Sequence, residues 1–196
     1  MNVHAAPVGY PAWIIFWVGL LVFAVLVALR RADGAGEAGA KRSGLSILGI
    51  FVQCLAFVAV GLGPPRFVLA AASREAVEQA AVTLVLVVFT CWLFWASKRA
   101  LGRNWSVVAR TRADHELVTS GPFAYVRHPI YGALFVWLIA MAVAFGHYWG
   151  LIPGIPLYWI GTVLRIREEE RLLGARFGAA YEAYAQRVKR FVPGII

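Results

Sequence analysis

Long apolar segments separated by short polar ones constrain this chain more than any other feature of its sequence. Residues 11–29 and 45–63 each approach the roughly 20 apolar residues that an α-helix needs to cross a bilayer. Of the 196 residues, 61% are hydrophobic and 15% are charged, whereas soluble domains average about 45–50% apolar and about 25% charged residues. So much apolar surface must face lipid, and the sequence therefore predicts an all-α, polytopic membrane protein.

Three further apolar segments extend the prediction to five transmembrane helices. Residues 78–97 form the third, and residues 130–146 and 148–164 form the fourth and fifth. Only Gly146 and His147 separate the last two, so these two helices should form an antiparallel hairpin. His147 is expected in an exposed outer turn.

The C-terminal segment has a different character from the apolar segments. From Arg165 onward the pattern is that of an amphipathic helix, with apolar residues every three or four positions between Leu173 and Phe191. Pro193 should end this helix, which is expected at the membrane surface or on the protein itself. The whole chain, 1–196, is predicted to be a single integral membrane domain. Its 1–97 portion holds three spans, and its 98–196 portion holds the helical hairpin and the C-terminal helix.

The basic residues predict the orientation of the chain in the membrane. If the N-terminus lies outside, 17 of the 19 Lys and Arg residues, all except Arg66 and Arg74, fall on the cytoplasmic side, as the positive-inside rule requires. The N-terminus is therefore expected outside and the C-terminus in the cytoplasm. No basic residue precedes Arg30, so the first apolar segment is read as a retained span and not as a secretory signal.

The net charge of +9 and the two cysteines add little to the functional prediction. The basic residues flank apolar segments, where they set topology and meet anionic lipid, so nucleic acid is not an expected partner. Cys54 and Cys91 lie within apolar segments, with no paired cysteine and no nearby histidine cluster. Neither a disulfide nor a metal site is predicted.

The densest polar information lies in residues 121–132, where the chain re-enters the membrane. Pro129 disfavours a helical conformation at His128 and suits the first turn of the helix that follows. Arg127 and His128 therefore flank a helix N-terminus, whose free N–H groups and partial positive charge attract a carboxylate or phosphate. The alternative is that Arg127 reaches lipid phosphates and His128 only caps the helix.

A second charged group occupies residues 165–171, at the end of the fifth predicted span. Its three consecutive carboxylates are costly beside a membrane unless they are paired or solvated. Arg165 with Glu169, and Arg167 with Glu170, have the spacing for ion pairs on one helix, and a purely solvated face is the alternative. The hairpin should bring this group to residues 127–128, and such a mixed-charge site suits a zwitterionic ligand.

These residues resemble a known family of membrane enzymes. The ordered elements lie between residues 101 and 193 and resemble those of the isoprenylcysteine carboxyl methyltransferases and their phospholipid methyltransferase relatives. They are Leu101-Gly102-Arg103-Asn104-Trp105-Ser106, the segment from Gly121 to Gly132, Glu169-Glu170-Arg171-Leu172-Leu173, Phe177-Gly178, Tyr181, Tyr184, Arg190 and Phe191-Val192-Pro193.

The resemblance implies a membrane O-methyltransferase that uses S-adenosylmethionine and releases S-adenosylhomocysteine. Its acceptor would be lipophilic, either a small lipid carboxylate or a prenylated substrate, and residues 98–196 would form the cofactor-binding half. The cofactor-binding residues that the resemblance implies are Tyr125, Arg127, His128, Tyr131, Glu169 and Glu170. Arg165 and Glu169 are assigned to the catalytic step.

Two other functions share some of these features. Sterol-reductase-like membrane enzymes carry a similar Arg-His-Pro-x-Tyr segment but bind NADPH, and a catalytically inactive membrane scaffold could keep the fold alone. Residues 100–120 are a further candidate element, either a lid over the cofactor or a passive connector.

Overall fold

The computed structural model describes residues 5–29, 43–105 and 116–192, and most of these residues are helical. Two short parallel strands and three 3-10 turns accompany the helices. The longer helices are α1 (Tyr10–Ala28), α2 (Gly44–Gly61), α3 (Arg74–Leu101), α4 (Pro129–Phe145), α5 (Leu151–Phe177) and α6 (Ala179–Arg187). The short elements are β1 (Pro7–Val8), β2 (Arg66–Phe67), η1 (Gly102–Asn104), η2 (Gly121–Ala124) and η3 (Tyr148–Gly150).

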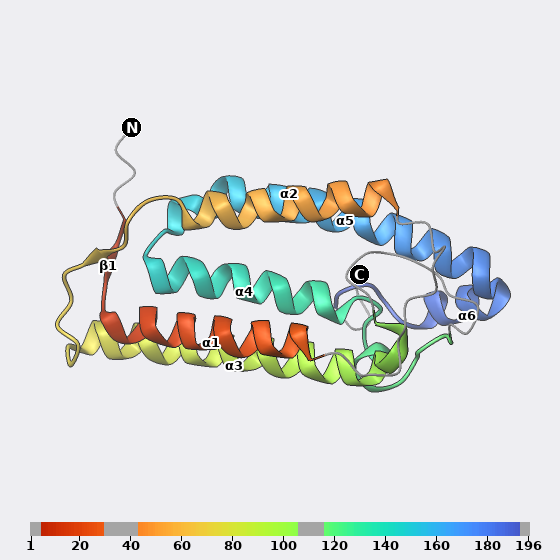
Figure 1. Ribbon diagram of the computed structural model, residues 1–196, viewed down its shortest axis with the longest axis horizontal. Helices are drawn as coiled ribbons and strands as arrows, with labels where there is room; N and C mark the ends of the chain where they lie inside the picture. The colour runs from red at the N-terminus through yellow and green to blue at the C-terminus, as the bar shows by residue number, and fades with distance from the viewer. Residues whose placement is uncertain (1–4, 30–42, 106–115, 193–196) are drawn as a thin grey trace.

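Helices α1 to α5 lie side by side, with α4 between two helix pairs (Figure 1). One pair is α1 with α3 and the other is α2 with α5. Trp137 of α4 packs with Phe16 and Val87 on the first side, and Leu138 packs with Tyr158 on the second. Helix α4 thus lies at the centre of the bundle, and both helix pairs fix its position.

Local sequence signals account for where several helices begin. The hydroxyl of Ser43 accepts a hydrogen bond from the backbone N–H of Ser46 at the start of α2, and Ser73 caps α3 in the same way. Helix α4 begins at Pro129, whose fixed φ suits the first turn.

Helices α2 and α5 approach each other closely because glycines face each other at their crossing. A Cβ on Gly161 would lie 2.6 Å from the carbonyl oxygen of Gly49 and 2.8 Å from Cγ of Gln53. Small residues allow such close backbone contact between membrane helices. Gln53 is therefore held directly against the α5 backbone.

Residues 5–9, 62–73 and 146–150 gather at one end of the bundle, which we call the strand end. Its β1–β2 pair is supported by a hydrogen bond from the N–H of Ala6 to the carbonyl of Gly146, 2.8 Å long. The expectation that His147 is exposed is wrong. Its side chain is buried, and Nδ1 lies 3.0 Å from the carbonyl oxygen of Val60. This carbonyl lies in the last turn of α2, where carbonyls have no helical partner.

The predicted helical character is confirmed. Among the residues that the structure describes, three helices, α1, α2 and α3, are long and apolar enough to cross a membrane, and α4 is a shorter apolar helix. The prediction of a separate amphipathic helix from Arg165 is wrong, because α5 continues without interruption through that residue to Phe177. The break comes at Gly178, whose φ of +49° favours glycine. After it, α6 ends at Arg187 rather than at Pro193.

Candidate functional site

The candidate site lies at the end of the bundle opposite the strand end, where α4 begins and the charged half of α5 passes it. We call this the site end. Two backbone hydrogen bonds attach the segment before α4 to the segment after α6: Arg127 N–H donates to the Lys189 carbonyl over 2.8 Å, and His128 N–H to the Arg190 carbonyl over 3.0 Å. Residues far apart in sequence therefore meet because the chain returns across the start of α4.

The carboxylate of Glu170 is the centre of a cluster of basic side chains. Nη2 of Arg127 lies 3.0 Å from Oε1 of Glu170, and Nε2 of His128 lies 3.2 Å from the same oxygen. Nη2 of Arg190 lies 2.6 Å from the other carboxylate oxygen. Arg127 also donates to the carbonyls of Ala185 and Val188, at 2.7 and 2.5 Å. The cluster thus links α4, α5 and the segment that follows α6.

This environment keeps Glu170 ionised. Burial alone would favour its neutral form, but the hydrogen bonds from His128, Arg190 and Arg127 together outweigh burial and hold the pKa of Glu170 far below its usual range. The same contact raises the pKa of Arg190. One carboxylate contacts three basic side chains, so the first effect of the cluster is to fix the positions of Arg127 and His128.

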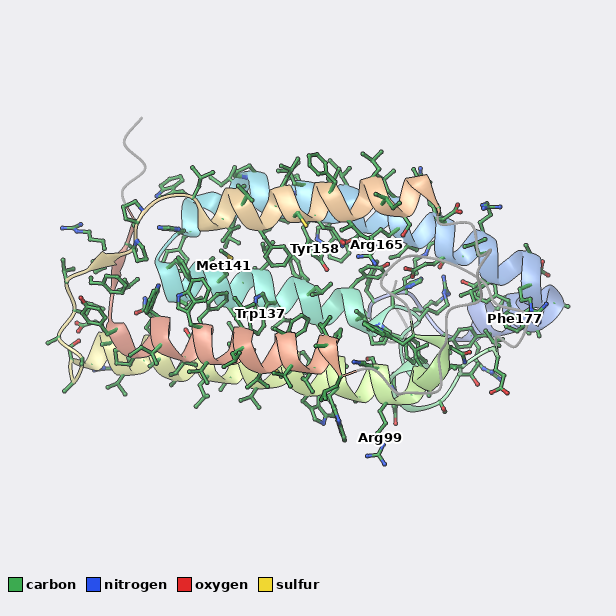
Figure 2. The ribbon with its side chains drawn as sticks, in the orientation of Figure 1. Arg99, Trp137, Met141, Tyr158, Arg165 and Phe177 are labelled. Atoms are coloured by element: carbon green, nitrogen blue, oxygen red, sulfur yellow. The ribbon has the colours of Figure 1, made fainter. Side chains whose placement is uncertain are left out.

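Glu169 belongs to a second group, centred on Tyr131. The Tyr131 hydroxyl donates a hydrogen bond to Glu169, and Nδ1 of His128 lies 3.7 Å from Oε2 of the same carboxylate. The guanidinium carbon of Arg165 lies 4.9 Å from the centroid of the Tyr131 ring, within cation–π range. Tyr158 holds this part of α4 through a 2.5 Å hydrogen bond from its hydroxyl to the Tyr131 carbonyl. Figure 2 shows Tyr158 and Arg165 between the α2–α5 pair and α4.

A cavity of about 290 Å³ opens beside these groups, close to the lower end of the roughly 300–1,000 Å³ of small-molecule sites. Its polar lining includes Asn104, Glu116, Arg127, His128, Tyr131, Arg165, Glu169, Tyr181 and Tyr184. Its apolar lining includes Phe23, Val27, Phe94, Leu101, Leu117, Val118, Phe123, Leu134, Leu172 and Leu173. The cavity thus places both signs of charge next to an extended apolar wall.

Most of the residues predicted at the site line the cavity, and two of them, Tyr125 and Glu170, do not. Arg127, His128, Tyr131, Arg165 and Glu169 line the cavity. Glu170 contacts Arg127, His128 and Arg190 without being part of that lining.

Tyr125 is the second of the two residues outside the lining. Its side chain is 70% exposed, and its predicted role in cofactor binding stays a prediction.

The ion pairs within α5 differ from the predicted ones. Glu170 turns toward Arg127 and Arg190, and Glu168 pairs with Arg171 at 2.7 Å, so the proposed Arg167–Glu170 pair is replaced by contacts across elements. The prediction considered spacing on one helix alone. The segment after α6 brings Arg190 closer to Glu170 than the basic residues of α5 are.

Two contacts at the site, those of Arg190 and of Gln53, were not predicted from the sequence. Arg190 was noted only as part of the resemblance, and its pairing with Glu170 depends on how the chain folds back after α6. Gln53 donates a hydrogen bond to Thr162 and accepts one from Arg165. The sequence feature that could have indicated it is a single amide within the apolar segment 45–63.

The loop expected to act as a lid is described only in part. Asn104, Trp105 and Glu116 line the cavity, and Nδ2 of Asn104 donates to the Glu116 carbonyl over 3.3 Å. Four residues of the predicted lid, Arg110, Arg112, Asp114 and His115, lie outside the described residues. Within residues 5–29, 43–105 and 116–192, no three His, Cys, Asp or Glu side chains gather as a metal site requires.

Comparison with known proteins points to one family. The sequence profile of the isoprenylcysteine carboxyl methyltransferase (ICMT) family matches residues 80–175. A protein-S-isoprenylcysteine O-methyltransferase of Schizosaccharomyces pombe is 34% identical over 87 residues, 44% of this chain and 37% of that protein. The protein of that name from Dictyostelium discoideum is 37% identical over 84 residues, 43% of this chain and 35% of that protein.

A plant relative matches a similar share of the chain. Protein-S-isoprenylcysteine O-methyltransferase B of Arabidopsis thaliana is 33% identical over 94 residues, 47% of this chain and 48% of that protein. The chain thus matches between about a third and a half of the length of these curated relatives. The profile match contains α4 and most of α5, and therefore most of the polar lining of the cavity.

Proposed function

We propose that this chain is a membrane methyltransferase that uses S-adenosylmethionine, because the profile of the isoprenylcysteine carboxyl methyltransferase family matches residues 80–175. Its acceptor is the carboxylate of a lipophilic molecule, most simply an isoprenylcysteine-like compound. The observation that carries the proposal is the cavity, which is lined both by Arg165, His128 and Glu169 and by apolar side chains that include Phe23 and Leu134. A charged methyl donor and an apolar acceptor need such a divided site.

The residues present fit the charges of the donor. S-adenosylmethionine, when bound, supplies an electrophilic methyl group on a sulfonium, and it also carries an ammonium and a carboxylate. Arg127 would attract the carboxylate by its charge, with His128 beside it. Glu170 and the carbonyls of Ala185 and Val188 already accept from four of the five N–H groups of this guanidinium, so one N–H remains for the donor. Glu169, whose side chain is 27% exposed and lines the cavity, would bind a cationic group. Glu170 would act by holding Arg127 and His128 in place.

The proposed roles of Arg165 and Glu169 in catalysis follow from what the reaction needs. A carboxylate acceptor is already a nucleophile, so catalysis depends mainly on alignment and on exclusion of water. The Arg165 guanidinium would orient the acceptor carboxylate from its place over Tyr131. Glu169, held by the Tyr131 hydroxyl, would keep its negative charge next to the donor. The apolar wall would bind the hydrocarbon part of the acceptor.

The membrane arrangement is part of the proposal. We infer five spans, with the N-terminus outside and the C-terminus and the site end in the cytoplasm. This inference is supported by the side-by-side helices (Figure 1) and by the positive-inside rule, because this orientation assigns 17 of the 19 Lys and Arg residues of the sequence to the cytoplasmic side. Cysteines introduced at Ala72 and at Gln186, in a background without Cys54 and Cys91, test it. A membrane-impermeant thiol reagent added to intact cells should label the first variant only, and labelling of the second alone would reverse the orientation.

Calorimetric titration of the purified protein tests the donor assignment. S-adenosylhomocysteine should bind and NADPH should not. Methyl transfer to a prenylcysteine analogue should follow, and the amide of the same analogue should not be methylated, because it lacks the acceptor carboxylate. Heat with NADPH alone would instead support the sterol-reductase-like alternative and exclude the proposed activity.

A further inference from the structure

Gln53 is a buried amide in the middle of α2, a helix that precedes the family-matched segment 80–175. Only 4% of its surface is exposed. A polar side chain within a membrane helix is costly, so it generally faces the protein interior and serves a function there. Its neighbours on α2 at the next turn, Gly49 and Ala56, are small or apolar. The Gln53 amide is therefore a buried polar group between small or apolar neighbours on its face of α2.

Both ends of this amide make hydrogen bonds to α5. Nε2 of Gln53 donates to the Thr162 hydroxyl over 2.7 Å, and Oε1 accepts from Nη1 of Arg165 over 2.9 Å. A guanidinium can only donate, so it must meet the amide oxygen, and the amide nitrogen is then directed to Thr162. Gln53 thus connects two α5 residues that lie about one turn apart, and one of them lines the cavity.

Helix α2 also makes room for the stem of Arg165. A Cβ on Gly49 would lie 2.5 Å from Cγ of Arg165, so the aliphatic part of Arg165 crosses α2 where a side chain is missing. Beyond this crossing, Gln53 meets the guanidinium, and the guanidinium lies over the Tyr131 ring. Two positions of α2 therefore determine the course of one side chain from α5 to α4.

We propose that Gln53 is a positioning residue, which holds the Arg165 guanidinium over Tyr131 so that Arg165 can orient the acceptor carboxylate. The inference rests on the proposed function and extends it to α2. Gln53 itself does not line the cavity, so it acts through Arg165. Without Gln53, the Arg165 guanidinium keeps its charge but is no longer held in one orientation. The acceptor carboxylate is then poorly aligned, whereas binding of the donor changes less.

A purely structural role would have a different signature. If Gln53 only joined α2 to α5, its loss would lower stability and would reduce donor binding and acceptor turnover together. If it positions Arg165, its loss should reduce the kcat/KM for the acceptor while the affinity for S-adenosylhomocysteine is kept. Measuring both quantities on the same preparation separates the two roles.

The test compares three variants of the full chain in detergent. Gln53→Met keeps the length of the side chain but removes both hydrogen bonds, Gln53→Glu keeps an oxygen that can accept from Arg165, and Leu55→Met is a control on the exposed face of α2. Gln53→Met should lower kcat/KM for a prenylcysteine analogue by about 10- to 100-fold, the range expected when a reacting group is misaligned. Its dissociation constant for S-adenosylhomocysteine should stay within about twofold of that of the unmodified protein, close to the scatter expected for an untouched site. Gln53→Glu should restore most of the activity, and Leu55→Met should retain all of it.

Several outcomes would overturn the inference: unchanged turnover in Gln53→Met, an equal loss of S-adenosylhomocysteine affinity, or a Gln53→Glu variant as impaired as Gln53→Met. If Gln53→Met does not fold, Thr162→Val replaces it, because this change removes the partner of the amide nitrogen and leaves Gln53 in place. If the unmodified protein binds no S-adenosylhomocysteine, it is the proposed function that fails. In that case a solved structure of Gln53→Met decides the inference by whether Arg165 has left the Tyr131 ring.

Discussion

The two ends of the helix bundle are held together by different chemistry. At the strand end the elements are joined by neutral groups: Gly9 N–H donates to the Gln79 side chain over 3.0 Å, and Gln79 donates to the Val143 carbonyl over 3.1 Å. At the site end the corresponding contacts are ionic, with Glu170 between Arg127 and Arg190. Neutral contacts are sufficient to hold the helices together at the strand end. Charged side chains are costly to bury, so their concentration at the site end indicates that a charged ligand binds there.

The largest effect is expected from Glu170→Gln. The change leaves Arg127, His128 and Arg190 around a neutral amide, and breaking a buried ion pair from one side costs about 3–5 kcal/mol. Binding of S-adenosylhomocysteine should also be lost, because Arg127 and His128 are no longer held in place. Thermal unfolding and calorimetry measure the two effects.

The start of α3, next to the strand end, offers a matched control for this change. Glu78 pairs with Arg74 at 2.7 Å, but both side chains are largely exposed, 61% and 88% respectively. Glu78→Gln should therefore cost no more than about 1 kcal/mol and should leave binding intact. Equal losses in the two variants would remove the distinction between the ends.

A smaller effect, confined to stability, is expected from Gly146→Ala at the strand end. Gly146 has a φ of +68°, and a Cβ there would lie 2.4 Å from the carbonyl oxygen of Ala6. The conformational strain and the displaced backbone together should lower the free energy of unfolding by about 2–3 kcal/mol. The fraction that remains folded should bind S-adenosylhomocysteine normally. Gly44→Ala is the control, since a Cβ at Gly44 meets nothing within 4 Å.

Glu169→Gln should affect binding and leave stability almost unchanged, which distinguishes Glu169 from its neighbour Glu170. The Glu169 side chain is more exposed than that of Glu170, 27% against 16%, and it lines the cavity. Loss of its charge should weaken S-adenosylhomocysteine binding about tenfold, which corresponds to about 1.4 kcal/mol. The unfolding temperature should change little. An unaltered affinity would show that Glu169 does not contact the ligand.

The contrast between the two ends could be predicted from the sequence only in part. The apolar segments and the loop charges were sufficient to predict the helices and to bring residues 127–128 near residues 169–170. Which carboxylate faces the cavity was not predictable, because this depends on the rotation of α5 and on the return of Arg190 across α4. The burial of His147 was missed for a similar reason, since its partner, the Val60 carbonyl, belongs to a helix 87 positions away.

The smallest expected effect is the response of the site end to mild acid. The contacts of Glu170 hold its pKa far below the ordinary value of about 4.3. A group whose pKa is depressed by folding contributes its full stabilisation above its unfolded pKa and loses it as the pH falls toward the folded pKa. The stability difference between the unmodified protein and Glu170→Gln should therefore be constant from about pH 8 to about pH 5.5 and should shrink only below about pH 5. Unfolding temperatures of both proteins across this range measure it. A difference that already declines near pH 6.5 would contradict the depressed pKa of Glu170.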